Sequence, residues 1–292
     1  MSYPVSLSAP ASEPQAASAG AEHAQSPPAA TAEIQVECSR YFRYKPALGR
    51  LLAALILAPA LPVIGLLALL TRLTSRGPGL YWQLRVGRAG RTFYLYKIRT
   101  MRADAEATSG PVWTEQDDPR ITTLGRFLRR LHLDELPQLF NVLRGEMALI
   151  GPRPERPEFT QYLAREIPGY MKRYAVLPGI TGLAQINLPP DSDVEGVRRK
   201  LVLDLEYVRR ATLTLDLRIM LCTALKLFGL PAMRIAGWLK LWRNPRVPDW
   251  MRREPSGNGS AVQPAPTTYT LAVGGAHQPA NGACKSPAKS PH

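Results

Sequence analysis

Cysteine and histidine are scarce in this sequence, and their scarcity excludes several kinds of site. The 292 residues include three cysteines, Cys38, Cys222 and Cys284, whose wide separation matches no metal-ligand spacing. They argue against a zinc site and a disulfide framework, and they indicate a reducing compartment. His132 is the only histidine between residues 34 and 254, and no serine–histidine–aspartate arrangement is recognisable around it.

Glycine-rich phosphate loops are also missing. The sequence has neither a Walker-type loop nor a GxGxxG motif after a strand, so nucleotide hydrolysis and hydride transfer are not indicated. The first 30 residues lack the basic and apolar regions of a secretory signal peptide.

Acidic residues are in the minority, with 23 Asp and Glu against 37 Lys and Arg and a net charge of +14. Residues 1–33 contain no Lys or Arg, and residues 255–292 contain two lysines. Both ends lack the apolar content that offsets the entropy of ordering, so we predict disordered tails at 1–39 and 255–292. Residues 34–254 carry 35 basic and 20 acidic residues. This excess predicts an anionic partner: nucleic acid, a phosphorylated small molecule or anionic lipid.

One uncharged apolar run, Leu51–Leu70, is long enough to cross a bilayer, since a helix of this length measures about 30 Å. Two features resist a simple crossing. Pro59 and Pro62 lie at its centre, where each removes a backbone donor and bends the helix. Basic residues flank the run on both sides, and the positive-inside tendency keeps such flanks cytoplasmic. They are Arg40, Arg43, Lys45, Arg50, Arg72 and Arg76.

A helix that enters the membrane, turns at the proline pair and leaves on the same side satisfies both features. We therefore predict a re-entrant helix, with an ordinary kinked transmembrane helix as the alternative. A second apolar and basic segment spans residues 216–243 and is interrupted at Gly229–Pro231. Its tryptophans beside Lys and Arg fit an amphipathic helix in the headgroup plane, with packing on the core as the alternative.

The segment between these two membrane features is predicted to hold the chemistry. Residues 80–100 read as strands around a glycine turn, and residues 121–131 have the spacing of a helix with one apolar side. Asp134 and Glu135 follow. Asp134 is placed to cap the next helix, with Pro137 in its first turn, so capping is one interpretation of this acid.

Nearby cations favour a second interpretation. Lys97 and Arg99 end the earlier strand, Gly151–Pro154 is a rigid turn that presents Arg153, and Pro178–Gly182 is a third loop defined by proline and glycine. An adjacent carboxylate pair near such cations is typical of phosphate chemistry. One carboxylate attacks phosphorus or holds a divalent ion, while Lys and Arg neutralise phosphoryl oxygens. Spacing alone leaves the substrate open.

Several motifs resemble, in order, the signatures of one family. They are YKIRTM at 96–101, DELPQLFNV at 134–142, GPRP at 151–154, PGITGLAQIN at 178–187, DLEYV at 204–208 and DLRIM at 216–220. Together they resemble the bacterial sugar transferases, which are monotopic polyprenyl-phosphate hexose-1-phosphate transferases, and the resemblance covers about residues 40–229. Because a Pro/Ala/Ser-rich tail precedes Arg40, the chain is similar to the short forms that initiate exopolysaccharide with galactosyl or glucosyl phosphate.

The resemblance implies a mechanism and a set of site residues. A uridine diphosphate (UDP) sugar donates hexose-1-phosphate to polyprenyl (undecaprenyl) phosphate through an aspartyl-phosphosugar intermediate. Asp134 is implied as the nucleophile and Glu135 as its catalytic partner, which helps to bind Mg²⁺. Arg153 is implied as a phosphate-binding residue, with Lys97 and Arg99 as further substrate-binding cations. The motifs do not identify the sugar or the glycan.

The resemblance also implies a fold and a location. We expect an α/β fold, mostly helical with a small β element, as a monotopic membrane enzyme whose re-entrant helix is broken at Pro59 and Pro62. The expected parts are a tail at 1–39, the membrane helix with its flanks at 40–76, a catalytic domain with interfacial helices at 77–254, and a tail at 255–292. The expected location is the bacterial inner membrane, with the active site on the cytoplasmic face. Lipid of that membrane is an expected partner and nucleic acid is not, while homo-oligomerisation stays open.

Two other classes of function compete with an enzyme. A non-catalytic membrane adaptor for glycan assembly has no need to keep Asp134, Glu135 and Arg153 together. A basic nucleic-acid binder has no need of the apolar run, and no nucleic-acid-binding module is recognisable.

Overall fold

The computed structural model describes residues 36–102, 105, 118–190, 193–227, 230–252 and 284–285. Its α-helices are α1 (Lys45–Thr74), α2 (Thr123–Arg130), α3 (Gln138–Arg144), α4 (Pro157–Glu166), α5 (Leu183–Asn187), α6 (Val194–Arg210), α7 (Leu213–Leu227) and α8 (Ala232–Trp238). Its 3₁₀ helices are η2 (Arg40–Arg43), η3 (Arg88–Gly90), η4 (Leu133–Glu135), η5 (Tyr170–Ala175) and η6 (Asp249–Met251). Its strands are β1 (Val36–Glu37), β2 (Leu80–Val86), β3 (Thr92–Ile98), β4 (Ala148–Ile150), β5 (Gly179–Thr181) and β6 (Cys284–Lys285).

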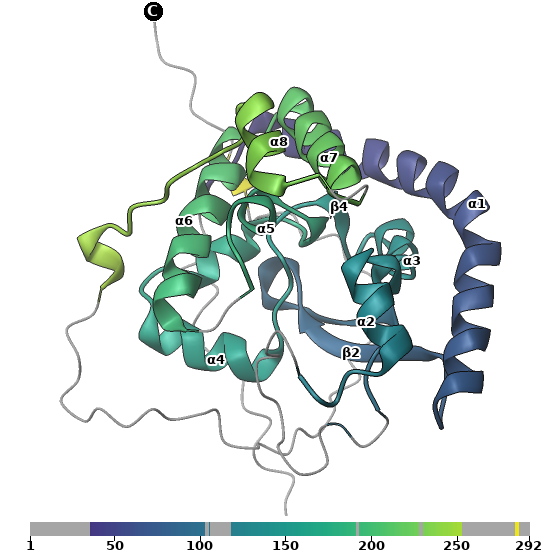
Figure 1. Cartoon of the computed structure of the whole chain (residues 1–292). Helices are drawn as coiled ribbons and strands as arrows, with labels where there is room; N and C mark the ends of the chain where they lie inside the picture. Colours follow the sequence, from purple (N-terminus) through teal and green to yellow (C-terminus); the bar gives the residue numbers. More distant parts are fainter. Residues whose placement is uncertain are drawn as a thin grey trace, which may run out of the picture.

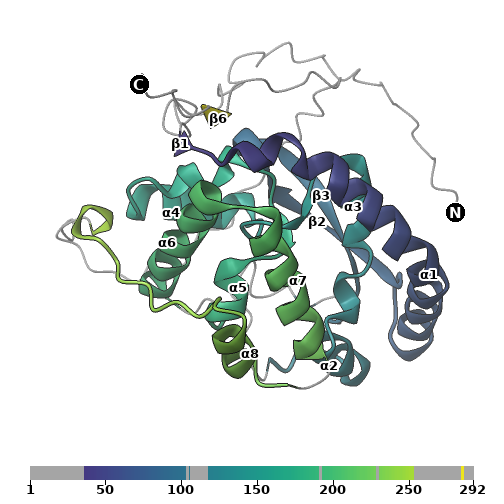
Figure 2. The ribbon, with the colours of Figure 1, turned by 90° about the horizontal axis from the view of Figure 1, so that it is seen from above.

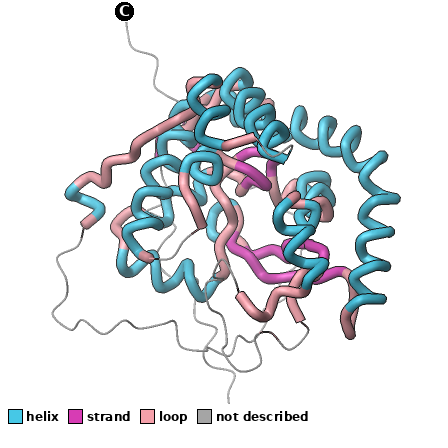
Figure 3. The backbone as a smooth tube through the Cα atoms, in the orientation of Figure 1, coloured by secondary structure: helices cyan, strands magenta, loops and turns pink. Residues whose placement is uncertain are grey.

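The described residues are mostly helical with a small sheet content, as the sequence predicts, and Figure 3 shows the strands as short pieces among the helices. Strands β2 and β3 form an antiparallel hairpin that pairs Leu80 with Ile98 at its open end and Val86 with Thr92 at its turn. This confirms the predicted strands around a glycine turn. Helix α2 confirms the helix predicted at 121–131.

Helix α1 packs along one side of the molecule, next to α3 and the β2–β3 hairpin (Figure 2). One face is buried against β3, α2 and α3 at a spacing of three or four residues, which marks a single helical face. Those residues are Ala53, Leu57, Ala60, Ile64 and Leu67. The opposite face is apolar as well but uncovered, with Leu51, Leu55 and Leu66 each more than half exposed. Among the described residues, α1 is the one helix long and apolar enough to span a membrane.

Figure 1 shows that α1 changes direction along its length. Pro59 and Pro62 lie inside the helix. Neither has a backbone N–H, and each ring crowds the carbonyl four residues earlier, which accounts for the bend that the sequence predicts.

Both ends of α1 are tied to the same domain. At the start, the buried Lys45 ammonium lies 2.6 Å from Oδ2 of Asp216 on α7, and it also contacts the hydroxyl of Tyr207 on α6. That hydroxyl donates to Oδ1 of Asp216 at 2.6 Å. At the far end, Arg99 Nη2 donates to the carbonyl and the hydroxyl of Ser75, at 2.8 and 2.7 Å. The bend therefore brings the chain back to the body it left.

Strands β4 and β5 hold two proline- and glycine-defined loops together. They pair in parallel, with Ala148 opposite Gly179 and Ile150 opposite Thr181. A Cβ atom at Gly179 would overlap the backbone nitrogen of Gly151, so only glycine permits this approach. The two loops consequently pack backbone against backbone.

The interruption predicted at Gly229–Pro231 is confirmed, since α7 ends before it and α8 begins after it. Helix α8 buries Ile235 and Ala236 in the core, while Met233 and Trp238 are 73% and 78% exposed. It therefore combines packing on the core with an exposed apolar side.

Cys38 is disulfide-bonded, which the sequence argument against a disulfide framework does not anticipate, and Cys222 is a buried free thiol. Spacing along the sequence could not reveal this, because β1 and β6 lie near opposite ends of the chain and pair in parallel. Apart from residues 36–39 and 284–285, the two predicted tails lie outside the described residues.

The contacts of Asp216 predict its importance for stability. Replacing Asp216 by Ala leaves the Lys45 charge buried without its partner, so we expect a loss of about 3–5 kcal/mol in the free energy of unfolding. Denaturant unfolding of the detergent-solubilised protein measures this. Asp249→Ala, at an exposed position of η6, is the control, and equal losses in the two variants would contradict the prediction.

Candidate active site

The acidic pair lies on the short helix η4, in the turn between α2 and α3. His132 precedes η4 in the left-handed region, with φ 51°, and redirects the chain after α2. Leu128 and Leu139 are buried on either side of the turn and anchor it in the core that α1 covers. Asp134 and Glu135 are themselves only 6% and 8% exposed. The local sequence thus places two adjacent carboxylates at the edge of a packed core.

Glu135 is held by two cations from different elements. Its Oε1 accepts from Lys97 Nζ of β3 at 3.0 Å and from Arg153 Nη2 of the Gly151–Pro154 loop at 2.6 Å. Charge-assisted hydrogen bonds of this kind are stronger than neutral ones. The structure therefore brings together four of the residues that the sequence singled out, because Asp134 is adjacent to Glu135.

Asp134 has a different environment from its neighbour. No hydrogen bond or ion pair from a described residue reaches its carboxylate. The capping interpretation is wrong, because α3 begins at Gln138 after Pro137 and has no side-chain cap. Lys97, Arg129 and Arg153 nevertheless lie within electrostatic reach of Asp134. The carboxylate of Asp134 therefore lies in a strongly positive surrounding, with no partner in the part of the chain that the structure describes.

The same cations set the ionisation of the site. Burial raises the pKa of Glu135, but the charges of Arg153 and Lys97 outweigh it and hold this pKa well below its usual range. Burial lowers the pKa of Lys97, against the opposing attraction of Glu135. Burial also lowers the pKa of His132. Glu135 is therefore an anion throughout the neutral range.

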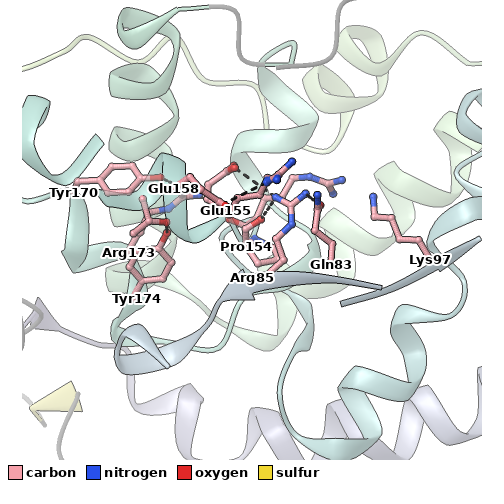
Figure 4. A network of polar contacts seen from close by, with 12 residues as sticks. Gln83, Arg85, Lys97, Pro154, Glu155, Glu158, Tyr170, Arg173 and Tyr174 are labelled. Atoms are coloured by element: carbon pink, nitrogen blue, oxygen red, sulfur yellow. Dashed lines mark hydrogen bonds and ion pairs between the residues drawn. The ribbon is translucent and has the colours of Figure 1, made fainter. Parts of the chain in front are cut away.

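The backbone of Arg153 is held in place by a buried ion pair. Arg173 Nη2 donates to the Arg153 carbonyl at 3.0 Å and lies 2.7 Å from Oδ2 of Asp204 on α6. Its guanidinium also packs against the rings of Tyr170 and Tyr174, seen beside it in Figure 4. An ion pair sequestered in the core thus fixes the backbone that carries Arg153.

A second arginine fixes the other side of this loop. Arg85 of β2 donates to the Pro154 carbonyl at 3.1 Å and to Gln83 Oε1 at 2.5 Å (Figure 4). It lies 3.6 Å from a carboxylate oxygen of Glu155. The loop is therefore held from the hairpin as well as from α6.

Arg99 does not join this group. It follows the end of β3, is buried, and binds Ser75 after α1 instead of approaching the acid pair. Pro59 and Pro62 lie in α1, apart from the acid pair in sequence and element. The structure thus places Lys97 at the acid pair and Arg99 at the end of α1.

Sequence reasoning missed Arg85, Arg173 and Asp204 as supports of the site. A signal for Asp204 exists, because it falls on the same helical face as the buried Leu201 and Val208. An acid among apolar positions at helical spacing indicates a buried partner. The partner, Arg173, lies in a separate 3₁₀ helix and could not be named from spacing.

The environment of Glu135 predicts how its contribution to stability depends on pH. Its native pKa lies below the ordinary value of 4.5, so the pairing stabilises the fold fully above pH 4.5 and is lost as the pH falls through the native pKa. The difference in melting temperature between the wild type and Glu135→Gln is expected to be constant around neutral pH and to shrink below pH 4.5. Thermal unfolding across pH measures it, with Glu166→Gln at an exposed position of α4 as control. A difference that grows in acid would contradict the prediction.

Comparison with known proteins finds several related transferases. A Bacillus subtilis protein is 50% identical over 140 residues, which are 48% of this chain and 78% of that protein, and it carries the provisional name of an undecaprenyl-phosphate N-acetylgalactosaminyl 1-phosphate transferase. The undecaprenyl-phosphate glucose phosphotransferase of Komagataeibacter xylinus is 44% identical over 59% of this chain and 33% of its own length. The UDP-glucose:undecaprenyl-phosphate glucose-1-phosphate transferase of Xanthomonas campestris is 38% identical over 66% of this chain and 41% of its own length.

The chain thus spans less than half the length of two of these relatives and most of the third. The profile of the bacterial sugar transferase family matches residues 40–229, which is more than half of the chain. The matched residues include the acid pair, both of its cations and all of α1. The chain belongs to the bacterial sugar transferase family.

Proposed function

We propose that this protein transfers a hexose-1-phosphate from a UDP-sugar to undecaprenyl phosphate and so initiates exopolysaccharide or a related glycan. The observation that carries the proposal is the difference between the two acids: Glu135 is fixed by two cations, whereas Asp134 has no partner among the residues that the structure describes. The names of the relatives supply the substrate classes, which are UDP-glucose or UDP-N-acetylgalactosamine as donor and undecaprenyl phosphate as acceptor.

In the proposed first step, a carboxylate oxygen of Asp134 attacks the phosphorus next to the sugar. The bond from this phosphorus to the bridging oxygen breaks, and uridine monophosphate (UMP) leaves with the electron pair. The product is a phosphosugar ester of Asp134. Covalent catalysis of this kind divides one transfer between two bulky anions into two displacements at one site. A carboxylate that accepts no hydrogen bond from the described residues is suited to be the nucleophile.

In the second step, a phosphate oxygen of the lipid attacks the same phosphorus. The bond to Asp134 breaks, its carboxylate is regenerated, and a polyprenyl diphosphate sugar is formed. Lys97 and Arg153 lie where they offset the charge on the phosphoryl oxygens in both steps. Part of their charge already balances Glu135, which keeps both cations in position before substrate arrives.

Magnesium belongs to the same proposal. Mg²⁺ typically binds through one or two carboxylates together with phosphate oxygens of the substrate. Glu135 uses only Oε1 for its two cations, so its Oε2 and the Asp134 carboxylate are the protein oxygens that would hold the ion. The described residues contain no group of three or more His, Cys, Asp or Glu that could bind a metal by themselves, so the diphosphate would complete the site. Bound there, the ion would offset charge on the diphosphate.

We further propose that α1 is re-entrant and that the protein is monotopic, on the cytoplasmic face of the inner membrane. The contact of Lys45 with Asp216 and that of Ser75 with Arg99 tie both ends of the helix to one domain. A helix crossing the bilayer would separate those ends by the full thickness of the membrane. The uncovered leucines of α1 and the exposed Met233 and Trp238 of α8 supply apolar surface for such an arrangement.

The nucleophile assignment predicts the effect of Asp134→Asn. This variant is expected to lose at least about 1,000-fold in turnover, since removal of a covalent nucleophile leaves only binding and electrostatic stabilisation. UMP release from a panel of UDP-sugars, dependent on undecaprenyl phosphate, measures activity and identifies the donor. Membrane association should be unchanged. Near-normal turnover by Asp134→Asn would contradict the assignment.

The re-entrant topology predicts that both flanks of α1 are cytoplasmic. Single cysteines introduced at Arg43 and at Arg76 should react with a membrane-impermeant thiol reagent in inverted vesicles but not in intact spheroplasts. The native cysteines would first be replaced by serine. Labelling of either position from the periplasmic side would establish a crossing and refute the re-entrant helix.

A further inference from the structure

A cavity of about 280 Å³ lies between the first half of α1 and the first half of α7. From α1 and the segment before it, it is lined by Tyr41, Lys45, Pro46, Leu48, Gly49, Leu51, Leu52 and Leu55. Val142 of α3 and Met147–Ile150 around β4 form its floor, and Leu213, Asp216, Leu217 and Met220 of α7 form the other wall. The lining is therefore almost entirely aliphatic.

The two charged residues in the lining neutralise each other. Lys45 and Asp216 are 2.6 Å apart, and Asp216 also accepts from the hydroxyls of Tyr41 and Tyr207. Neither charge calls for a counter-ion from a ligand. The cavity is therefore suited to a hydrocarbon chain and not to a charged headgroup.

The cavity opens onto the surface that we propose to face the membrane. Leu51 and Leu55 line the cavity and are 61% and 65% exposed, so they belong to the uncovered face of α1 as well. Leu213 and Leu217 on the opposite wall are 46% and 52% exposed. A lipid chain could enter from the bilayer without leaving an apolar surrounding.

Helices α3 and α7 both extend from the lining of the cavity towards the acid pair. Val142 lies near the end of α3, a helix of about 10 Å that starts three residues after Glu135. On α7, the exposed Leu221 continues the row of Leu213 and Leu217, and Lys226 lies just beyond, close enough for its charge to act on His132. A chain attached to a phosphate at the acid pair would thus reach the cavity.

We propose that this α1–α7 cavity holds part of the prenyl chain of the lipid phosphate acceptor. The proposal rests on the proposed function, since it assigns a place to one of its two substrates. The aliphatic walls, the internally neutralised charges and the continuity with the uncovered face of α1 favour a single hydrocarbon chain. The short path to Asp134 favours the acceptor over bulk phospholipid.

Two glycines of α1 provide a matched pair of variants. A Cβ atom at Gly49, which lines the cavity, would meet nothing within 4 Å, and the same holds at Gly65, which lies further along α1 and does not line it. Gly49→Phe fills open space in the cavity, whereas Gly65→Phe adds the same group to the same helix outside it. At both positions the first side-chain atom has room among the described residues.

The experiment uses the full chain in nanodiscs and a polyprenyl phosphate with a photoreactive diazirine in its chain. The wild type and Gly65→Phe are expected to crosslink at α1 and α7 peptides of the cavity, and the yield should fall about tenfold in Gly49→Phe. The KM for undecaprenyl phosphate should rise by a similar factor while the KM for the UDP-sugar is unchanged. An unchanged yield in Gly49→Phe, or crosslinks of the wild type elsewhere, would overturn the proposal.

Competition with unlabelled lipids distinguishes binding of the acceptor from binding of bulk phospholipid. Unlabelled undecaprenyl phosphate should abolish the crosslink, and an equal excess of phosphatidylglycerol should not; equal competition would assign the cavity to phospholipid and overturn the proposal. The same measurements distinguish failure of the proposed function from failure of the cavity proposal. A wild type that crosslinks in the cavity but releases no UMP from any UDP-sugar contradicts only the proposed reaction. A wild type that releases UMP but crosslinks elsewhere contradicts the cavity alone.

Discussion

The ion pairs of Glu135 with Lys97 and Arg153 are the contact on which the rest of the candidate site depends. One carboxylate oxygen joins a strand, a 3₁₀ turn and a loop that are far apart in sequence. Burial raises the pKa of Glu135, and the charges of Arg153 and Lys97 outweigh this effect and keep the carboxylate ionised. The same two cations create the positive surrounding of Asp134, which has no hydrogen-bond or ion-pair partner among the described residues. Buried Arg173 and Asp204 hold the backbone of Arg153, so the site is rigid before any substrate binds.

Helix α1 and the candidate site are parts of one packed structure. The inner face of α1 forms a core with β3, α2 and α3, the elements that carry or flank the acid pair. Arg99 joins the end of this helix to the strand that also carries Lys97. In the proposed re-entrant topology, a water-soluble donor and a lipid acceptor meet at the membrane surface, and neither substrate crosses the bilayer.

Local patterns in the sequence predicted the local structure well. The β2–β3 hairpin, α2, the bend of α1 and the break between α7 and α8 all follow from periodicity and from proline and glycine. Contacts between distant segments could not be predicted in this way. The separation of Lys97 from Arg99 depends on where β3 ends, and the burial of Asp204 depends on a partner in another element. The sequence is compatible with Asp134 as a helix cap or as a catalytic acid. The structure excludes the cap, because α3 begins only after Pro137.

The central claim is that Asp134 forms a covalent phosphosugar intermediate, and mass spectrometry of the protein tests it most directly. The purified enzyme would be incubated with its UDP-sugar in the absence of lipid phosphate, quenched and digested. We predict a mass increase of one hexose phosphate on the peptide that contains Asp134, lost on addition of undecaprenyl phosphate. Stoichiometric UMP release with the adduct on another residue, or full turnover with no adduct at any time point, would contradict the account.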